Sequence, residues 1–285
     1  MAIKNQFKTI ILLGALTGIL LWIGSFWGQS GLMFALIFSI IMNFGAYWFS
    51  DKIALAIYRA KPVSENEAPK LYKIVRDVAH LANIPAPRIY IIPSNILNAF
   101  ATGRSRKHAA VAATKGIIEA LNEDELKGVI AHEISHIRNN DILIQSVAAT
   151  IAGVISFIAM MARWGAIFGG FGGRNRRGGG GLELLVLAIL TPILATIIRL
   201  AISRSREFLA DESGAKLIHN GHSLASALEK LETASQKMPL RPTSSTQTTA
   251  HMMIVNPFRA RGIIKLFTTH PPVHLRTKRL RSMNF

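Results

Sequence analysis

The longest uncharged stretch of the chain runs from Thr9 to Ser50 and contains no Asp, Glu, Lys or Arg. The hydrocarbon core of a bilayer is about 30 Å thick, and a helix of about 20 apolar residues crosses it. The stretch is therefore long enough for two membrane-spanning helices, and GQSG at 28–31 is the natural place for a turn. This predicts one span at Thr9–Trp27 and another at Leu32–Ser50.

The first span has Lys4 and Lys8 in front of it, as a secretory signal peptide does. Its apolar core exceeds the roughly 7–15 residues of a signal peptide, and no clear small-x-small cleavage site follows. We therefore expect an uncleaved membrane anchor.

Two more apolar runs lie in the second half of the chain. Ile142–Ala162 carries no charge, and Leu182–Ile198 is shorter and contains Glu183 near its start. They predict a second transmembrane hairpin and about four transmembrane helices in all. The alternative is that these two runs form buried core helices. Residues 165–181 between them contain nine glycines but lack the G-x-x-x-x-G-K-[ST] order of a phosphate-binding loop. That segment is expected to be a flexible connector.

The net charge of +17 has two explanations, nucleic-acid binding or a cytoplasmic bias of the basic residues. The segments 51–141 and 199–285 hold 27 of the 33 Lys and Arg, and the 28–31 turn holds none. This distribution favours cytoplasmic segments beside an anionic bilayer, and no nucleic-acid motif is present. One conflict remains, because four spans would place the arginines of 163–181 on the outer side.

The soluble segments are expected to form a mainly α-helical fold with a small β-sheet. SENE at 64–67 resembles a capping box that starts a helix ending near Ala82. Three short β-like runs follow, from which we expect antiparallel pairing. These runs are Arg88–Ile92, Asn98–Thr102 and His108–Thr114.

A second capping box, Asn122 with Glu125, predicts the helix that carries AHEISHI at 131–137. This helix is expected to continue through Asp141 into the third apolar run. A further helix is predicted over 203–218, and the polar residues of 236–257 are expected to be a mobile loop.

The pattern H-E-x-x-H at His132, Glu133 and His136 is typical of metal-dependent hydrolases. Residues four apart share one face of a helix, so both imidazoles can point at one ion. Glu133 is rotated by roughly 100° from His132, given about 3.6 residues per turn. From there it can act on a water molecule at the site as general base and later as acid. The alternative is a pair of ordinary surface histidines.

A third ligand is needed, and the chain has no cysteine. Glu207 and Asp211 are four apart on the helix predicted over 203–218, so one carboxylate can bind zinc while the other orients a histidine. Glu212 is a rival that points about 100° away from Asp211. The alternative is that these acids form exposed ion pairs with Arg204 and Arg206.

AHEISHIRNND, SRSREFLADESGA and TTHPP, together in a chain with four apolar runs, closely resemble the HtpX family of membrane zinc metalloproteases, relatives of the CAAX prenyl protease. The resemblance covers nearly the whole chain, including NAFATG at 98–103 and AHMMIVNPF at 250–258. It implies that His132, His136 and Glu207 bind one zinc ion per subunit and that Glu133 is catalytic. It also implies a zincin-like fold.

The same resemblance implies a multi-pass inner-membrane protease whose active site faces the cytoplasm. Its substrates would be membrane or misfolded proteins, in quality control and the stress response. One departure follows His270, where family members often carry an acidic pair before an arginine. Here the stretch reads VHLR, and Arg276 stands in the place of that arginine.

Two further residues are candidates for substrate binding. Asn98 belongs to the strand before the HExxH helix, where an edge strand could pair with an extended peptide; the alternative is a plain turn residue. His270 could stabilise an oxyanion, or it could be an ordinary loop histidine. The alternative function is a membrane-bound metal-binding protein without hydrolase activity.

The chain thus divides into two membrane and two soluble parts. They are a transmembrane hairpin (1–50), the first half of a catalytic domain with the HExxH helix (51–141), a second hydrophobic hairpin (142–200) and the second half of that domain (201–285).

Overall fold

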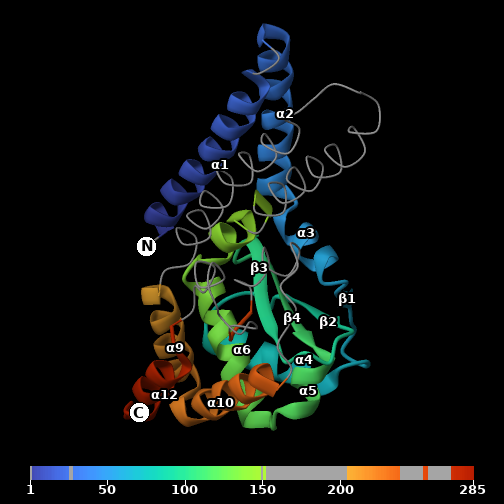
Figure 1. The fold of residues 1–285 in the computed structure, drawn as a ribbon. Helices are drawn as coiled ribbons and strands as arrows, with labels where there is room; N and C mark the ends of the chain where they lie inside the picture. Colours follow the sequence, from blue (N-terminus) through green and yellow to red (C-terminus); the bar gives the residue numbers. More distant parts are fainter. Residues whose placement is uncertain (1, 26–27, 149, 152–203, 238–252, 256–270) are drawn as a thin grey trace.

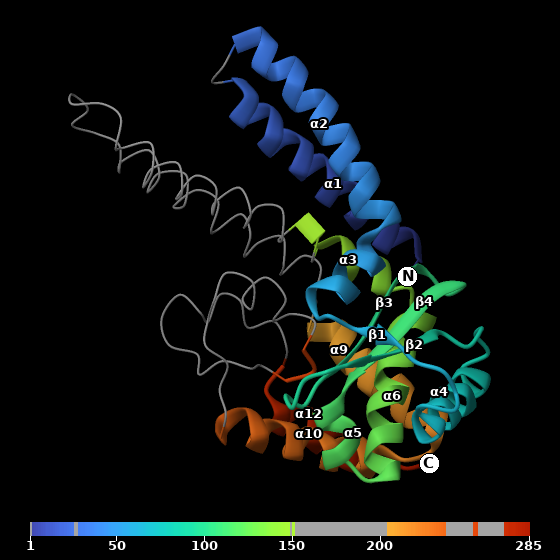
Figure 2. The same ribbon diagram turned by 90° about the vertical axis from the view of Figure 1, so that its right-hand side faces the viewer.

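A computed structural model describes residues 2–25, 28–148, 150–151, 204–237, 253–255 and 271–285. The described part is mostly helical, with one small sheet (Figure 1). Two antiparallel helices project from a compact body that contains every strand (Figures 1 and 2).

The projecting helices are α1 (Ala2–Ser25) and α2 (Gly28–Trp48), which lie side by side in both views (Figures 1 and 2). Phe7–Ser25 and Gly28–Trp48 are long and apolar enough to cross a membrane. The Asn43 side chain donates a hydrogen bond to Thr17 Oγ1 at 2.7 Å between the two helices. Large apolar side chains face outward, as a lipid-facing surface requires. These include Phe34, Ile40 and Phe44.

The hairpin is confirmed, but the predicted position of its turn is wrong. Residues 28–31 form the first turn of α2, and Gly28, with φ +67°, has the backbone conformation that glycine adopts without strain. The fourth apolar run and the glycine-rich segment lie outside the described residues. Of the third run, 142–148 and 150–151 are described and helical, and Ile142, Ile144 and Ile151 are buried.

The sheet has four strands in the order β1-β2-β4-β3. Their bounds are β1 Lys61–Pro62, β2 Arg88–Ile92, β3 Ala99–Ser105 and β4 His108–Thr114. β3 and β4 form an antiparallel hairpin, as predicted, but β2 pairs with β4 in parallel. The expectation of purely antiparallel pairing is therefore wrong. The chain reverses direction between β2 and β3 and again between β3 and β4, so β4 runs parallel to β2, and it lies between β2 and β3 in the sheet.

Side chains alternate between the two faces of the sheet, as the two-residue period of a strand requires. Phe100, Ala110 and Ala112 pack under α3 (Ser50–Ile57), the helix that continues from α2. Ala101 and Val111 face the main core, where α4 (Pro69–Leu81) and α6 (Glu123–Arg138) pack. The short α5 (Lys115–Ala120) leads from β4 to α6.

The residue that caps α4 is Ala68, four residues after the predicted cap at Ser64. The Ser64 N–H does donate to Glu67 Oε2 at 2.6 Å, but this contact closes an isolated turn. Ala68 precedes a proline, and a residue in that position avoids the helical region; its φ and ψ are −140° and 59°. The helix therefore starts at Pro69, where a missing N–H costs nothing.

Helix α6 begins at the predicted capping box, in which Asn122 and Glu125 bond each other's backbone N–H. It does not run on through Asp141. It ends at Arg138, Asn140 has a φ of 58°, and the N–H of Asp141 donates to the His136 carbonyl at 2.9 Å. This left-handed residue closes the helix end, and the chain restarts as a helix at 142.

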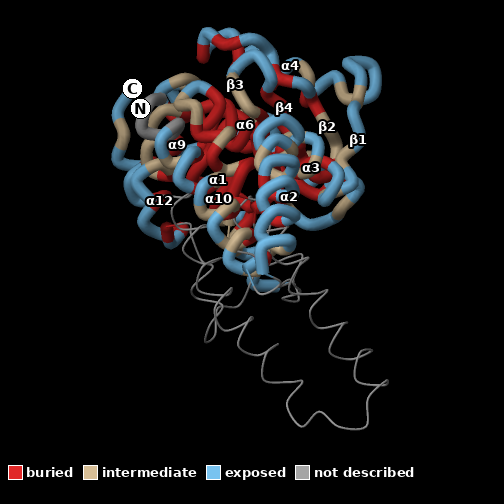
Figure 3. Tube along the Cα trace, turned by 90° about the horizontal axis from the view of Figure 1, so that it is seen from above, coloured by how far each residue is buried: buried red, intermediate tan, exposed pale blue. Residues whose placement is uncertain are grey.

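Two helices of the second half pack on α6: α9 (Arg204–Ile218) and α10 (Gly221–Lys237). A third, α12 (Val273–Arg281), packs on α10 and α9. A Cβ added at Gly214 would lie 2.9 Å from the backbone at Ala131 and His132, so α9 approaches the HExxH turn backbone to backbone. Gly128 makes the same kind of close approach to Leu224 on α10. Helix α6 is therefore buried from both sides (Figure 3).

Candidate active site

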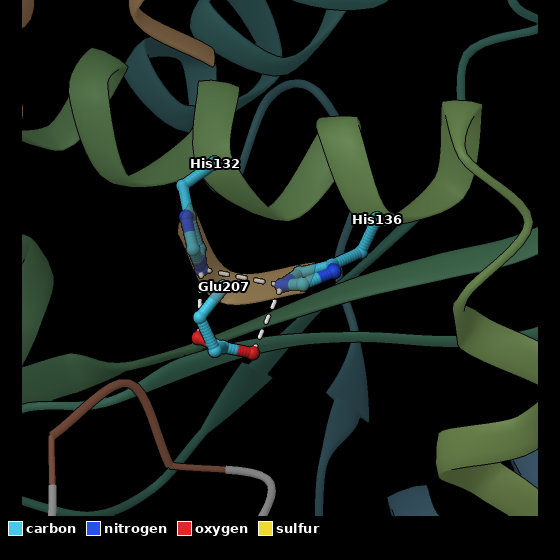
Figure 4. A group of neighbouring side chains, drawn as sticks. All are labelled: His132, His136 and Glu207. Atoms are coloured by element: carbon cyan, nitrogen blue, oxygen red, sulfur yellow. Dashed lines mark hydrogen bonds and ion pairs between the residues drawn. The ribbon is translucent and has the colours of Figure 1, made fainter. Parts of the chain in front are cut away.

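His132 and His136 on α6 face Glu207 on α9 (Figure 4). The two Nε2 atoms are 3.3 Å apart, and they lie 3.7 and 3.6 Å from the two carboxylate oxygens of Glu207. All three side chains are at most 3% exposed. One ligand atom from each residue lies within 4.8 Å of the others, so the group could hold a metal ion.

Each histidine also has a carboxylate on its other ring nitrogen. Asp211 Oδ1 lies 3.0 Å from Nδ1 of His132, and Asp141 Oδ2 lies 3.4 Å from Nδ1 of His136. Metal-ligating histidines commonly have such a partner, which fixes the ring and its tautomer. The residues present therefore fit a metal on geometry and on donor chemistry.

Asp141 was not anticipated from the sequence. Its proximity to His136 follows from the left-handed turn at Asn140, which folds the chain back at the end of α6. Arg206 lies 3.4 Å from the other Asp141 oxygen. The Asn-Asn pair after Arg138, a common helix stop, was the signal that could have revealed it.

The protonation of His136 reflects its acidic surroundings. Burial disfavours the charged ring, but the hydrogen bond with Asp141 and the charges of Glu207 and Glu133 raise the pKa of His136 to about 9. These three buried carboxyl groups, Asp141, Glu207 and Glu133, favour a positive charge at this position, which a bound cation could also supply.

Glu133 lies close to both histidines and to Glu207, and it also reaches the sheet. Its Oε2 accepts a hydrogen bond from the backbone N–H of Ala101 on β3 at 2.8 Å. Burial raises the pKa of the Glu133 carboxyl, and the nearby histidines offset only part of that effect. A buried carboxyl with a raised pKa beside a metal-ligand group is suited to proton transfer.

Arg276 on α12 is fully buried and binds Asp211 through two hydrogen bonds, of 2.8 and 2.7 Å. Burial would raise the pKa of Asp211, but the charge and hydrogen bonds of Arg276, with a contribution from His132, lower it to about 2. Arg276 also donates to the carbonyl of Ile254 at 3.0 Å. Arg276 therefore binds the carboxylate that contacts His132, although the residues before it lack the acidic pair that family members often carry.

Of the two substrate candidates, only Asn98 is described. It is 1% exposed, directly precedes β3, and accepts a hydrogen bond from the Ile254 N–H at 3.2 Å. Its Nδ2 has no partner among the described residues. His270 lies outside the described residues, as do most of residues 236–257.

The two glutamates of α9 have different surroundings. Glu207 is 0% exposed and faces the histidines, whereas Glu212 is exposed and pairs with Lys216 at 2.6 Å. Arg206 lies near Asp141 rather than in a surface pair on α9. The geometry thus brings Glu207 and Asp211 to the HExxH helix and keeps Glu212 away from it.

A HExxH helix joined by a carboxylate from a second helix, beside an edge strand, is the arrangement of zincin-like metallopeptidases. Residues 65–284 match the family model described as Peptidase family M48. A protease HtpX homolog from Syntrophobacter fumaroxidans is 53% identical over 98% of this chain and 99% of its own length. Another, from Thermococcus sibiricus, is 49% identical over 99% and 97%.

The chain therefore belongs to peptidase family M48, and it is a membrane metalloprotease of the HtpX type. Among solved structures, S. mikatae Ste24p is 19% identical with a TM-score of 0.49, covering 98% of this chain and 66% of that one. The family model and the HtpX homologs do not favour a metal-binding protein without hydrolase activity.

Proposed function

We propose that this metalloprotease uses one zinc ion per subunit, bound by His132, His136 and Glu207. The observation that carries the proposal is the convergence of their three ligand atoms within 4.8 Å in a buried position. Two imidazoles and one carboxylate are the kind of three-ligand donor set that is typical of catalytic zinc. When bound, zinc polarises the scissile carbonyl and lowers the pKa of a water molecule toward about 7.

Glu133 is the residue proposed to move the proton. It takes a proton from the attacking water and later gives it to the leaving amine. Its hydrogen bond from the Ala101 N–H fixes the carboxylate, and its raised pKa suits a group that must both accept and donate a proton. Asp211 and Asp141 orient the two imidazole rings, with Arg276 fixing Asp211.

Strand β3 is proposed to bind the substrate as an added strand. It is the last strand in the order of the sheet, so no described strand pairs with its outer edge, where the N–H groups of Ala101 and Gly103 donate to Glu133 and Ser146. An extended peptide can hydrogen-bond such an edge, and β3 runs directly past Glu133. The Nδ2 of Asn98, which has no partner among the described residues, supports a contact with a substrate carbonyl, and His270 remains a predicted stabiliser of the oxyanion.

The natural substrates are proposed to be membrane or misfolded proteins, cleaved in quality control and under stress. The enzyme is placed in the inner membrane, with the catalytic domain in the cytoplasm. Two observations support this: the apolar α1–α2 hairpin is joined directly to the catalytic domain, and most Lys and Arg lie in the soluble segments. Four spans stay a prediction, because most of 142–200 lies outside the described residues.

The test compares Glu133→Gln with the exposed Glu119→Gln as a control. Purified Glu133→Gln should keep about one zinc per chain, measured by elemental analysis, and should lose peptidase activity. Proteomic comparison of membranes that contain the active protein or Glu133→Gln should then reveal the substrates. Normal cleavage by Glu133→Gln would refute the assignment, and a wild-type protein that binds zinc but cleaves nothing would favour the metal-binding alternative.

A further inference from the structure

The turn between β3 and β4 carries a cluster of cations without acidic partners. We define the hairpin tip as residues 103–108 (GRSRKH), which contain Arg104, Arg106 and Lys107. No Asp or Glu occurs anywhere from residue 78 to residue 118. Within the part of the chain that the structure describes, these three side chains form no ion pair, whereas other exposed basic groups do, as in Arg76–Glu65 and Arg281–Glu229.

Two contacts fix the position of the hairpin tip. The Arg104 guanidinium lies 4.3 Å above the ring of Trp48, the last residue of α2. The Arg106 guanidinium donates to the carbonyl of Arg138 at the end of α6. The tip therefore sits between the end of a candidate membrane span and the end of the HExxH helix.

The end of α2 has the features of a membrane–water boundary. Tyr47, Trp48 and Phe49 are consecutive, and each is about two-fifths exposed (36–44%). Phe34 and Ile40, which come earlier in α2, are 74% and 61% exposed. Aromatic residues of this kind gather at the headgroup level, and Arg and Lys extend toward it. Lys52 lies 5.4 Å over the Phe49 ring at the same level. Arg104, which stacks on Trp48, is then at headgroup depth.

We propose that the hairpin tip binds the phosphate groups of anionic phospholipids and thereby holds β3, the edge strand beside Glu133, at the bilayer surface. Arginine binds phosphate with a planar pair of donors, and each basic residue near an anionic surface strengthens binding about fivefold. The aromatic rings beside the cluster stand at the end of α2, a helix apolar enough to cross a membrane, and this favours a bilayer over a nucleic acid as the occupant. The lipid contact would keep the active-site strand within reach of segments that emerge from the membrane.

The experiment uses the full chain in detergent, with a fluorophore on Ser105→Cys, since the chain has no other cysteine. The probes are short-chain phosphatidylglycerol, short-chain phosphatidylcholine and inorganic phosphate. We expect a saturable signal with phosphatidylglycerol alone. The combined variant Arg104→Gln, Arg106→Gln, Lys107→Gln should bind it on the order of 100-fold more weakly.

A charge-matched control removes three exposed cations from α4, α10 and α12, which lie at the end of the body away from α1 and α2 (Figure 1): Lys70→Gln, Lys237→Gln and Lys278→Gln. It should bind like the wild type, and a variant with Lys at 104 and 106 should keep most of the binding. An equal loss in the control, an equal signal from inorganic phosphate or phosphatidylcholine, or tight binding of an oligonucleotide without lipid binding would overturn the proposal. The readout requires no peptide cleavage, so its outcome is separate from that of the proposed protease mechanism.

Discussion

Arg276 and Asp211 are joined by two parallel hydrogen bonds, although they lie 65 residues apart on different helices. Both are buried, and Asp211 in turn lies 3.0 Å from the ring of His132. Arg276 therefore reaches His132, a proposed metal ligand, through one carboxylate, and this links α12 to the candidate metal site.

Replacing Arg276 by Met should therefore weaken zinc binding by roughly 10–100-fold, as the loss of a partner behind a ligand histidine typically does. It should also lower stability by about 3–5 kcal/mol, because Asp211 is left buried without its counter-charge. Chelator competition measures the first effect and thermal unfolding in detergent the second. Arg281→Gln, which removes an exposed pair from the same helix, is the control and should change neither.

The double variant Arg276→Met, Asp211→Asn isolates this coupling. It should be more stable than Arg276→Met alone, since no unpaired charge remains. If the double variant loses as much stability as the two single variants together, the two residues act independently.

Glu207→Gln should lose peptidase activity and bind zinc weakly, because an amide replaces the carboxylate that faces both histidines. Glu212→Gln, on the same helix but exposed and paired with Lys216, should retain both properties. Zinc content after dialysis against a weak chelator distinguishes them. Full zinc in Glu207→Gln together with loss in Glu212→Gln would mean that the ligand is misassigned.

Glu125 should make stability depend on pH. Burial raises the pKa of this carboxyl, but hydrogen bonds from Lys230, Ser226 and Asn122 lower it below the ordinary 4.5. A carboxyl whose pKa is lower in the folded state contributes fully above pH 4.5, and that contribution is lost as the pH falls.

Glu125→Gln should therefore reduce the free energy of unfolding by about 1–2 kcal/mol at neutral pH, and the difference from the wild type should shrink in acid. Thermal unfolding at a series of pH values measures it. The exposed Glu229→Gln should show little effect at any pH. A difference that grows as the pH falls would contradict the sign of the pKa shift.

The two soluble segments should face the same side of the membrane. Single cysteines at Ser64 and Ser244, in a chain that otherwise has none, can be labelled with an impermeant reagent from either side. Both should react only in inverted membranes if the catalytic domain is cytoplasmic. Labelling of the two positions from opposite sides would refute the topology.

Local patterns anticipated the parts of this fold that local physics determines. The i, i+4 pair at His132 and His136, the capping box at Asn122 and the bounds of the strand His108–Thr114 all follow from side-chain periodicity and backbone hydrogen bonding. The burial of Glu207 opposite the histidines agrees with the requirement for a third ligand.

Features that depend on tertiary contacts were not accessible in this way. The parallel pairing of β2 with β4 depends on strand order, which no single strand reveals. The partnership of Arg276 with Asp211 spans two helices, and the departure in the residues before it obscured the role of the arginine. Asp141 reaches His136 only because Asn140 adopts a left-handed conformation that ends α6 earlier than its apolar pattern suggested.

The metal centre draws on α6, α9 and α12, three segments separated along the chain. Ribosomes make the histidine pair first, Glu207 later and Arg276 last. With the roles proposed above, a nascent chain inserts α1 and α2 into the membrane long before it can cut a peptide bond. Peptidase activity is then acquired late in biosynthesis, so a product arrested before α12 would be anchored in the membrane but unable to cleave other membrane proteins.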